Sequence, residues 1–191
     1  MSKTVSILGC GWLGKPLGTT LLSEGYTVKG STTTLRACKK LRVKGIKPFL
    51  IKIASKAVFS FPAGFWNCDI LIISIPPKRK TKTERAYPEI MAQVLRKIDA
   101  FKIKHVVFIS SSSVYPLNNA IVNENDEKSG DLRAGNALLN AEKVLSKGKS
   151  NLSIIRFGGL IGPDRRPGSF LKKRTRLPSG NAPVNLIMQD D

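Results

Sequence analysis

The sequence has few of the residues that build metal centres and disulfide scaffolds. Its 191 residues include one histidine, His105, and three cysteines, Cys10, Cys38 and Cys68, which are far apart and form no CxxC pair. This distribution predicts no metal site and free thiols, which are typical of a reducing cytosol. His105 stands at the start of an apolar run, where a strand-end residue is a more ordinary interpretation than a catalyst.

Long apolar segments are also missing. No apolar run approaches the roughly 20 residues that a helix needs to cross a bilayer, and the run at 5–8 is too short for a signal peptide. A hydrophobic fraction of 41% is typical of one globular domain with a buried core. We therefore expect a cytoplasmic protein without a membrane partner.

Acidic residues are scarce. Asp and Glu number 13 against 32 Lys and Arg, which gives a formal net charge of +19, and no acid lies between Glu24 and Asp69. Such an excess usually implies a polyanionic partner. The cations are spread along the chain, however, and no RNA-binding aromatic motif, zinc finger or helix-turn-helix accompanies them. The sequence therefore favours a solvated basic surface that partly faces a phosphorylated cofactor, and it disfavours nucleic-acid binding.

What is present is a regular alternation of strands and helices. We expect strands at 5–8, 26–28, 49–53, 69–75, 105–109 and 152–157, and helices at 12–23, 35–43, 84–101 and 131–145. The segment 69–75 is almost entirely β-branched or apolar, as in strands buried on both faces. This pattern predicts an α/β fold with a doubly wound parallel sheet, whose ligands bind beyond the carboxyl ends of the strands. From residue 158 onward we expect little regular structure.

A glycine-rich motif follows the first predicted strand and opens the first predicted helix. It consists of Gly9, Cys10, Gly11, Trp12, Leu13 and Gly14, in the pattern GxGxxG. In this context the first glycine allows a tight turn, the second lets the backbone approach a pyrophosphate, and the third lets the helix pack on the strand. The free N–H groups and the positive end of the helix dipole then hold the diphosphate. The motif predicts a Rossmann-type NAD(P)-binding fold.

The end of the second strand bears on the choice between NAD and NADP. NAD-binding domains usually carry an acid here, about 20 residues past the loop, which bonds the ribose 2′-OH. This chain instead has hydroxyls at Ser31, Thr32 and Thr33, followed by Arg36. Hydroxyls and cations suit a 2′-phosphate, so we expect NADP, with NAD as the alternative. Thr34 is also a candidate N-cap of the next helix.

Three further segments carry a family resemblance. They are FISSSSVYP at 108–116, VNE at 122–124 and IRFGGLIGPDR at 155–165. Together with the glycine motif they resemble the extended or atypical short-chain dehydrogenase/reductase superfamily, in its NAD(P)-dependent epimerase/dehydratase branch, which acts on nucleoside-diphosphate sugars. The resemblance implies that Ser111 contacts the substrate oxygen beside the nicotinamide. It also implies that Pro76 and Pro77 border the adenine and ribose.

The same resemblance exposes a missing catalytic pair. The family uses a Tyr as acid/base and a Lys four residues later, on the helix that ends in an Ala-Glu pair. Aligned on Ala141 and Glu142, these positions are Ala134 and Leu138, and neither side chain can move a proton. None of the three tyrosines is followed by a Lys at that spacing. We therefore expect altered or lost catalysis, because a positioned proton donor typically contributes about 10²–10⁴-fold.

The C-terminal part is short compared with this family. We expect a dinucleotide-binding domain at 1–160 and a truncated or minimal start of the substrate part at 161–191. Three hypotheses remain open from the sequence. The chain is a cofactor-binding protein with altered catalysis, a working NADP-dependent oxidoreductase or epimerase on a nucleotide-linked or small carbonyl substrate, or an NADP(H)-sensing regulatory protein.

Overall fold

The main sheet contains six parallel strands. The computed structural model describes residues 2–53, 62–77, 83–118, 120–126, 128–130, 133–168 and 183–191. The strand order is β3-β2-β1-β4-β5-β6. The strands are β1 Thr4–Leu8, β2 Thr27–Thr32, β3 Lys47–Leu50, β4 Ile70–Ile73, β5 His105–Ser111 and β6 Asn151–Phe157. The order changes direction between β1 and β4, so the predicted doubly wound sheet is confirmed.

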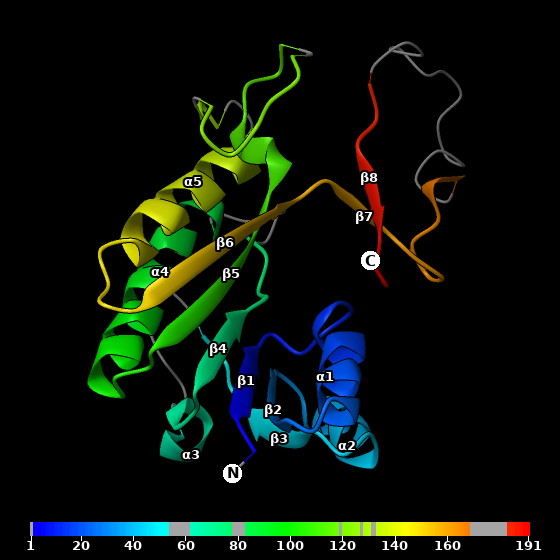
Figure 1. Cartoon of the computed structure of the whole chain (residues 1–191), viewed down its shortest axis with the longest axis vertical. Helices are drawn as coiled ribbons and strands as arrows, with labels where there is room; N and C mark the ends of the chain where they lie inside the picture. The colour runs from blue at the N-terminus through cyan, green and yellow to red at the C-terminus, as the bar shows by residue number, and fades with distance from the viewer. Residues whose placement is uncertain are drawn as a thin grey trace.

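Helices cover both faces of this sheet (Figure 1). They are α1 Gly14–Ser23, α2 Leu35–Val43, α3 Ala63–Trp66, α4 Thr83–Ala100 and α5 Arg133–Leu145, with a 3-10 turn, η1, at Ser112–Val114. Helices α1 and α2 lie beside β1–β3, whereas α4 and α5 pack against each other beside β4–β6. Within the described residues, no helix is long and apolar enough to cross a membrane.

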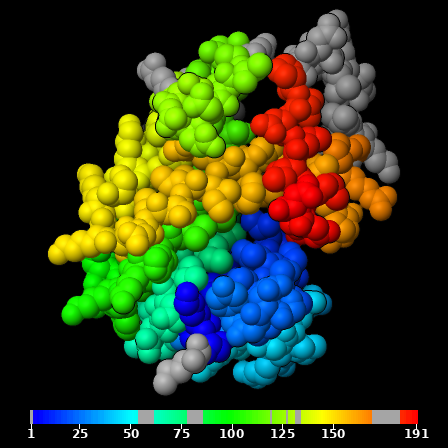
Figure 2. Space-filling model, in the orientation of Figure 1, coloured from blue at the N-terminus to red at the C-terminus, as the bar shows by residue number. Residues whose placement is uncertain are grey.

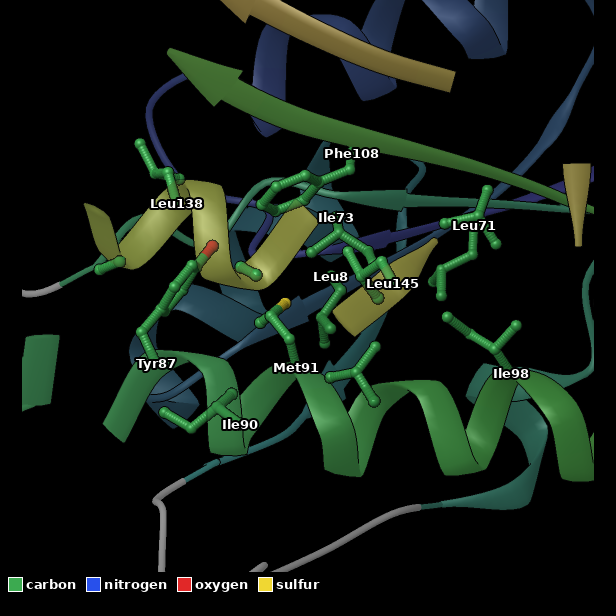
Figure 3. Packing of buried hydrophobic residues seen from close by; sticks show 14 of the residues in the cluster. Leu8, Leu71, Ile73, Tyr87, Ile90, Met91, Ile98, Phe108, Leu138 and Leu145 are labelled. Carbon is green, nitrogen blue, oxygen red and sulfur yellow. The ribbon is translucent and has the colours of Figure 1, made fainter. Parts of the chain in front are cut away.

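The strands are buried on both faces because apolar side chains alternate between two clusters. In β1, Val5 and Ile7 belong to the cluster under α1 and α2, while Leu8 points to the larger cluster under α4 and α5. Figure 3 shows the larger cluster, in which Met91 of α4 and Phe108 of β5 are completely buried. The carboxyl edge of the sheet is therefore held rigidly from both sides.

The tail after residue 158, where we expect little regular structure, contains two short strands. Strands β7, Gly159–Ile161, and β8, Leu186–Met188, pair in parallel as a separate two-stranded sheet. Each strand has only three residues, too few for a periodic pattern, and its partner is more than 20 residues away in the sequence. Strand β7 also crosses the domain boundary expected at residue 160. Of the expected C-terminal segment 161–191, residues 169–182 lie outside the described residues.

The other elements agree with expectation in existence and type, with shifts at their ends. Helix α2 has the predicted bounds, because Thr34 caps it by accepting a hydrogen bond from the N–H of Ala37 at 3.2 Å. Strand β2 continues past its predicted end at residue 28 to Thr32, since pairing with both β1 and β3 holds its polar end. The expected first two residues of helix 131–145 lie outside the described residues. The short helix α3 has no counterpart in the prediction.

Candidate functional site at the carboxyl edge of the sheet

The first residue of the glycine loop has a backbone conformation and surroundings that only glycine fits. Gly9 has a φ of +94°, in the left-handed region. A Cβ at Gly9 would lie 2.5 Å from Cγ2 of Ile75 and 2.8 Å from the carbonyl oxygen of Ser74. The residues that follow β4 therefore pack directly against the turn.

Gly11 and Gly14 differ sharply in their surroundings. A Cβ at Gly14 would lie 2.9 Å from the carbonyl oxygen of Gly9, so the helix packs tightly on the loop. A Cβ at Gly11 would meet nothing closer than 3.9 Å, and Gly11 is exposed. Leu13 is the N-cap residue of α1 and provides no side-chain hydrogen bond to the helix. The N–H groups at the start of α1 thus receive no cap from Leu13.

Ser31, predicted to face a 2′-phosphate, is placed against the glycine loop instead. Its buried hydroxyl accepts a hydrogen bond from the N–H of Gly9 at 2.8 Å, and its carbonyl accepts from the N–H of Cys10, also at 2.8 Å. Burial raises the pKa of the Cys10 thiol to about 12, despite the opposing charge of Lys15. Ser31 and Cys10 therefore hold the loop on the end of β2.

The remaining predicted 2′-phosphate residues line the exposed start of α2. Thr32 is half-buried at the end of β2, while Thr33 and Arg36 are exposed. No acidic residue occurs in the first turn of α2. Thr33 and Arg36 are thus open to solvent near the end of β2, where the sequence predicts the 2′-phosphate of the cofactor.

Pro76 and Pro77 follow β4, next to the loop. Ile75, which precedes them, contacts Gly9 and accepts a hydrogen bond through its carbonyl from the Tyr87 hydroxyl at 2.6 Å. This contact ties the segment to α4, and Pro76 itself is exposed. The structure thereby brings these prolines to the same edge as the glycine loop, although the adenine and ribose contacts remain a prediction.

Ser111 lies at the end of β5, further along the same edge. It is half-buried, and its Oγ accepts a hydrogen bond from the N–H of Ser113 at 3.2 Å, which caps η1. The hydroxyl proton is not used by this contact. The predicted contact with a substrate oxygen therefore remains compatible with the position of Ser111.

Ala134 and Leu138, which the resemblance aligns with a Tyr and a Lys, are packing residues. Leu138 is buried in the larger hydrophobic cluster and Ala134 is half-buried near the start of α5. The neighbouring Gly135 is pressed against η1, since a Cβ there would lie 2.0 Å from the carbonyl oxygen of Ser113. This end of α5 is fitted to η1, and neither position carries a titratable group.

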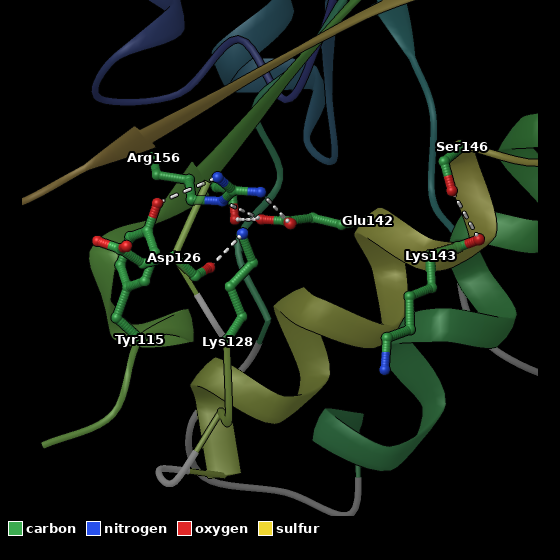
Figure 4. Close-up of polar contacts among 8 residues, drawn as sticks. Tyr115, Asp126, Lys128, Glu142, Lys143, Ser146 and Arg156 are labelled. Atoms are coloured by element: carbon green, nitrogen blue, oxygen red, sulfur yellow. Dashed lines mark hydrogen bonds and ion pairs between the residues drawn. The ribbon is translucent and has the colours of Figure 1, made fainter. Parts of the chain in front are cut away.

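A polar network between β5, α5 and β6 was not predicted from the sequence (Figure 4). Glu142 is 4% exposed and accepts hydrogen bonds from the Ser110 hydroxyl at 2.6 Å and from Nε and Nη2 of Arg156 at 3.1 and 2.8 Å. The hydrogen bond to Glu142 raises the pKa of Arg156. Nη1 of Arg156 donates to the hydroxyl of Tyr115 at 3.1 Å. Lys128 lies over the Tyr115 ring, with its Nζ 5.7 Å from the centroid.

A signal for this network was present in the sequence. Glu142 stands on the apolar side of its helix, and Arg156 interrupts an apolar strand. A charge at each of two otherwise apolar positions indicates a buried pair, because an isolated buried charge is very unfavourable. The pairing itself needs the fold, since only the sheet brings β6 beside α5.

Trp12 has unexpected partners from the C-terminal part. Nε2 of Gln189 donates to the carbonyl oxygen of Trp12 at 2.7 Å, and the guanidinium carbon of Arg165 lies 4.1 Å from the centroid of the Trp12 ring. A Cβ at Gly162 would lie 2.9 Å from the same ring. The segment containing β7 and β8 therefore sits directly on the glycine loop. Figure 2 shows the red and orange C-terminal residues against the blue N-terminal ones.

Comparison with solved structures gives the class of this fold. The chain superimposes on TunA, an NAD-dependent NDP-hexosamine 5,6-dehydratase, with a TM-score of 0.76, 16% identity and coverage of 100% of this chain and 69% of that one. For the UDP-N-acetylglucosamine 4-epimerase from Bacillus cereus, the TM-score is 0.74, the identity 14% and the coverage 100% and 70%. The chain therefore has the Rossmann-type α/β fold that these NAD-dependent dehydratase and epimerase structures share.

The sequence comparison gives the family within this class. The chain is 31% identical over 192 aligned residues to Protein YeeZ from Escherichia coli K12, covering 99% of this chain and 70% of YeeZ. It belongs to the family of YeeZ. A conserved protein of unknown function from Silicibacter pomeroyi has the same fold, with a TM-score of 0.71, 19% identity and coverage of 99% of this chain and 64% of that one. No protein-family model matches the chain.

Proposed function

We propose that this protein binds NADP(H) through the loop at 9–14 and that it has altered or lost the Tyr/Lys catalysis of its superfamily. The observation that carries the proposal is the difference among the three loop glycines. Gly9 and Gly14 are required by contacts inside the chain, whereas Gly11 has neither a positive φ nor a close neighbour. The space beside Gly11 thus suits a diphosphate that approaches the backbone.

Proteins of similar structure support a nicotinamide dinucleotide as the ligand. MoeE5, at 19% identity and a TM-score of 0.68, is known in complex with UDP-glucose and NAD, and TunA is NAD-dependent. The end of β2 here lacks the acid that bonds a ribose 2′-OH and offers Thr32, Thr33 and Arg36. We therefore assign these three residues to the 2′-phosphate of NADP. Pro76 and Pro77 border the adenine and ribose in this proposal.

The proposal of altered catalysis rests on Ala134 and Leu138. NADP(H) supplies or accepts a hydride when bound, and reduction of a carbonyl also needs a proton. Ser111 can donate a hydrogen bond to a substrate oxygen, but a serine hydroxyl without a base partner is a poor proton donor. Leu138 is 6% exposed and packs in the core. This position therefore has no Lys to assist proton transfer.

Cofactor binding is tested by NADPH titration of wild type and Gly11→Asp, followed by fluorescence. The added carboxylate should repel the pyrophosphate and weaken binding by at least about 100-fold. Asn151→Asp is the matched control, because it adds the same charge at the opposite edge of the sheet. Equal affinity of wild type and Gly11→Asp would refute the binding proposal.

Cofactor preference is tested by calorimetry with NADP and NAD on the same protein. We expect tighter binding of NADP, and we expect Arg36→Gln to reduce this preference about tenfold while leaving NAD unchanged. Tighter binding of NAD to the wild type would contradict the assignment of the 2′-phosphate.

Catalysis is tested by NADPH oxidation against a panel of nucleotide sugars and aldehydes. We expect at most very slow turnover by the wild type, and a gain in an Ala134→Tyr/Leu138→Lys variant if that variant remains folded by circular dichroism. Robust wild-type turnover would show that another residue supplies the proton, and the proposal of altered catalysis would then be abandoned.

A further inference from the structure

We propose that Arg165 is a ligand of the dinucleotide diphosphate and that Trp12 positions it. This inference rests on the proposed cofactor binding and adds a residue from outside the nucleotide-binding motifs. Arg165 follows β7 in the chain, 153 positions beyond Trp12, and belongs to the segment that sits on the glycine loop. The diphosphate of the cofactor is the chemical class that this residue would bind.

The geometry of the stacked guanidinium supports this role. The guanidinium carbon lies over the Trp12 ring, 4.1 Å from its centroid, so the side chain is held against the indole. A guanidinium held in this way can present its N–H donors to the oxygens of a phosphate in a bidentate arrangement. Within the described residues, Arg165 forms no ion pair, and the side chain is exposed.

The electrostatics of the start of α1 point the same way. The helix has no acid in its first turn, and Lys15 lies in that turn. A second cation near the positive end of a helix dipole is unfavourable on its own. The acids nearest in sequence to Arg165 and Gln189 are Asp164, Asp190 and Asp191. Asp191 accepts a hydrogen bond from the N–H of Met188 at 3.2 Å. An anion between Arg165 and α1 would relieve this accumulation of positive charge.

The C-terminal segment is held on the loop by contacts that do not involve Arg165. Gln189 bonds the carbonyl of Trp12, and Gly162 leaves no room for a side chain against the Trp12 ring. The position of residue 165 therefore survives replacement of its guanidinium. This permits a test in which the charge is removed while the segment stays in place.

The test compares the affinity for NADPH of wild type, Arg165→Gln, Arg165→Lys and the control Arg96→Gln, by calorimetry at several salt concentrations. Arg96 is exposed on α4, far from the loop in sequence and on the helix pair beside β4–β6. We expect Arg165→Gln to weaken NADPH binding by about 10- to 100-fold, since a hydrogen bond to a charged group contributes about 1.5–3 kcal/mol. Arg165→Lys should retain part of the affinity, and the control should match wild type.

Two readouts separate a ligand from a merely structural residue. Loss of one phosphate contact should make the salt dependence of NADPH binding shallower for Arg165→Gln. Binding of 2′-AMP, which has no diphosphate, should be unchanged in that variant. Equal weakening of NADPH and 2′-AMP would show a structural role and overturn the inference.

The failure of this inference is distinct from the failure of the cofactor proposal. If Gly11→Asp abolishes NADPH binding while Arg165→Gln binds like wild type with the same salt dependence, the loop binds the cofactor and Arg165 is not its ligand. If wild type does not bind NADPH at all, the cofactor proposal fails, and this inference fails with it.

Discussion

The two halves of the carboxyl edge use their residues in opposite ways. After β1 and β2, glycines and hydroxyls shape a backbone turn, and exposed groups such as Thr33 and Arg36 remain available to a ligand. Near the ends of β5 and β6, Ser110 and Arg156 both donate hydrogen bonds to Glu142 of α5. Where the superfamily has its proton-transfer pair, this second half has Ala134 and buried Leu138.

Under the proposed function, this difference is that between a retained cofactor site and an altered catalytic site. The turn at Gly9 is fixed by backbone geometry and by close contact with β4, so few substitutions are tolerated. Leu138 only has to fill a volume in the core, and a hydrophobic core accepts any residue of suitable size and polarity. The backbone conformation of the turn thus constrains the first half, and side-chain packing constrains the second half.

The largest effect is expected in the second half, at Glu142. Glu142→Ala removes the partner of Arg156, whose side chain is only 15% exposed, and leaves the Ser110 hydroxyl without its acceptor. We expect a loss of about 3–5 kcal/mol in the free energy of unfolding, measured with urea. Glu89→Ala, an exposed acid on α4, is the control and should change stability by less than about 0.5 kcal/mol.

The same variant sharpens the contrast between the halves. If Glu142 is structural, the folded fraction of Glu142→Ala should bind NADPH with unchanged affinity. A loss of stability below about 1 kcal/mol would mean that the buried network contributes little, and loss of NADPH binding by the folded protein would remove the distinction between the halves.

A smaller effect is expected in the first half, where two glycines should behave differently. Gly9→Ala must adopt a left-handed φ and accommodate a Cβ 2.5 Å from Ile75, and we expect a destabilisation of about 2–4 kcal/mol. Gly11→Ala should leave the free energy of unfolding within about 0.5 kcal/mol of wild type but weaken NADPH binding at least about tenfold. Urea unfolding and NADPH titration of both variants test this. Similar stabilities for the two variants would contradict the contacts described for Gly9.

The effect expected from Cys10 is absent at neutral pH and is confined to alkaline pH. Because burial raises the pKa of its thiol from 9.0 to about 12, the unfolded chain loses this proton first as the pH rises above 9. The contribution of Cys10 is thus fully present below pH 9 and is lost toward pH 12, by at most about 1.4 kcal/mol per pH unit. The free energy of unfolding should therefore fall less steeply in Cys10→Ala than in wild type between pH 9 and 11. Identical slopes would show that the thiol is accessible to water.

Prediction from sequence succeeded where the signal is local and failed where it depends on distant partners. Helix α2 was bounded correctly because Thr34 and the apolar spacing are local features. The hydroxyl of Ser31 was expected to face a ligand, but it bonds Gly9, because the pairing of β1 with β2 brings the two residues together. The contact between Trp12 and Arg165 has no sequence signature, since it joins a loop to a segment that is almost a whole chain length away.

The hydrogen bond between Gln189 and Trp12 has a consequence for the order of folding. It joins residues 177 positions apart, so it closes nearly the entire chain into one loop. Contacts of such sequence separation form after local ones, because the entropy of loop closure must be overcome first. During synthesis the glycine loop leaves the ribosome well before Arg165 and Gln189, which contact Trp12. The loop is thus translated long before the residues that pack on it.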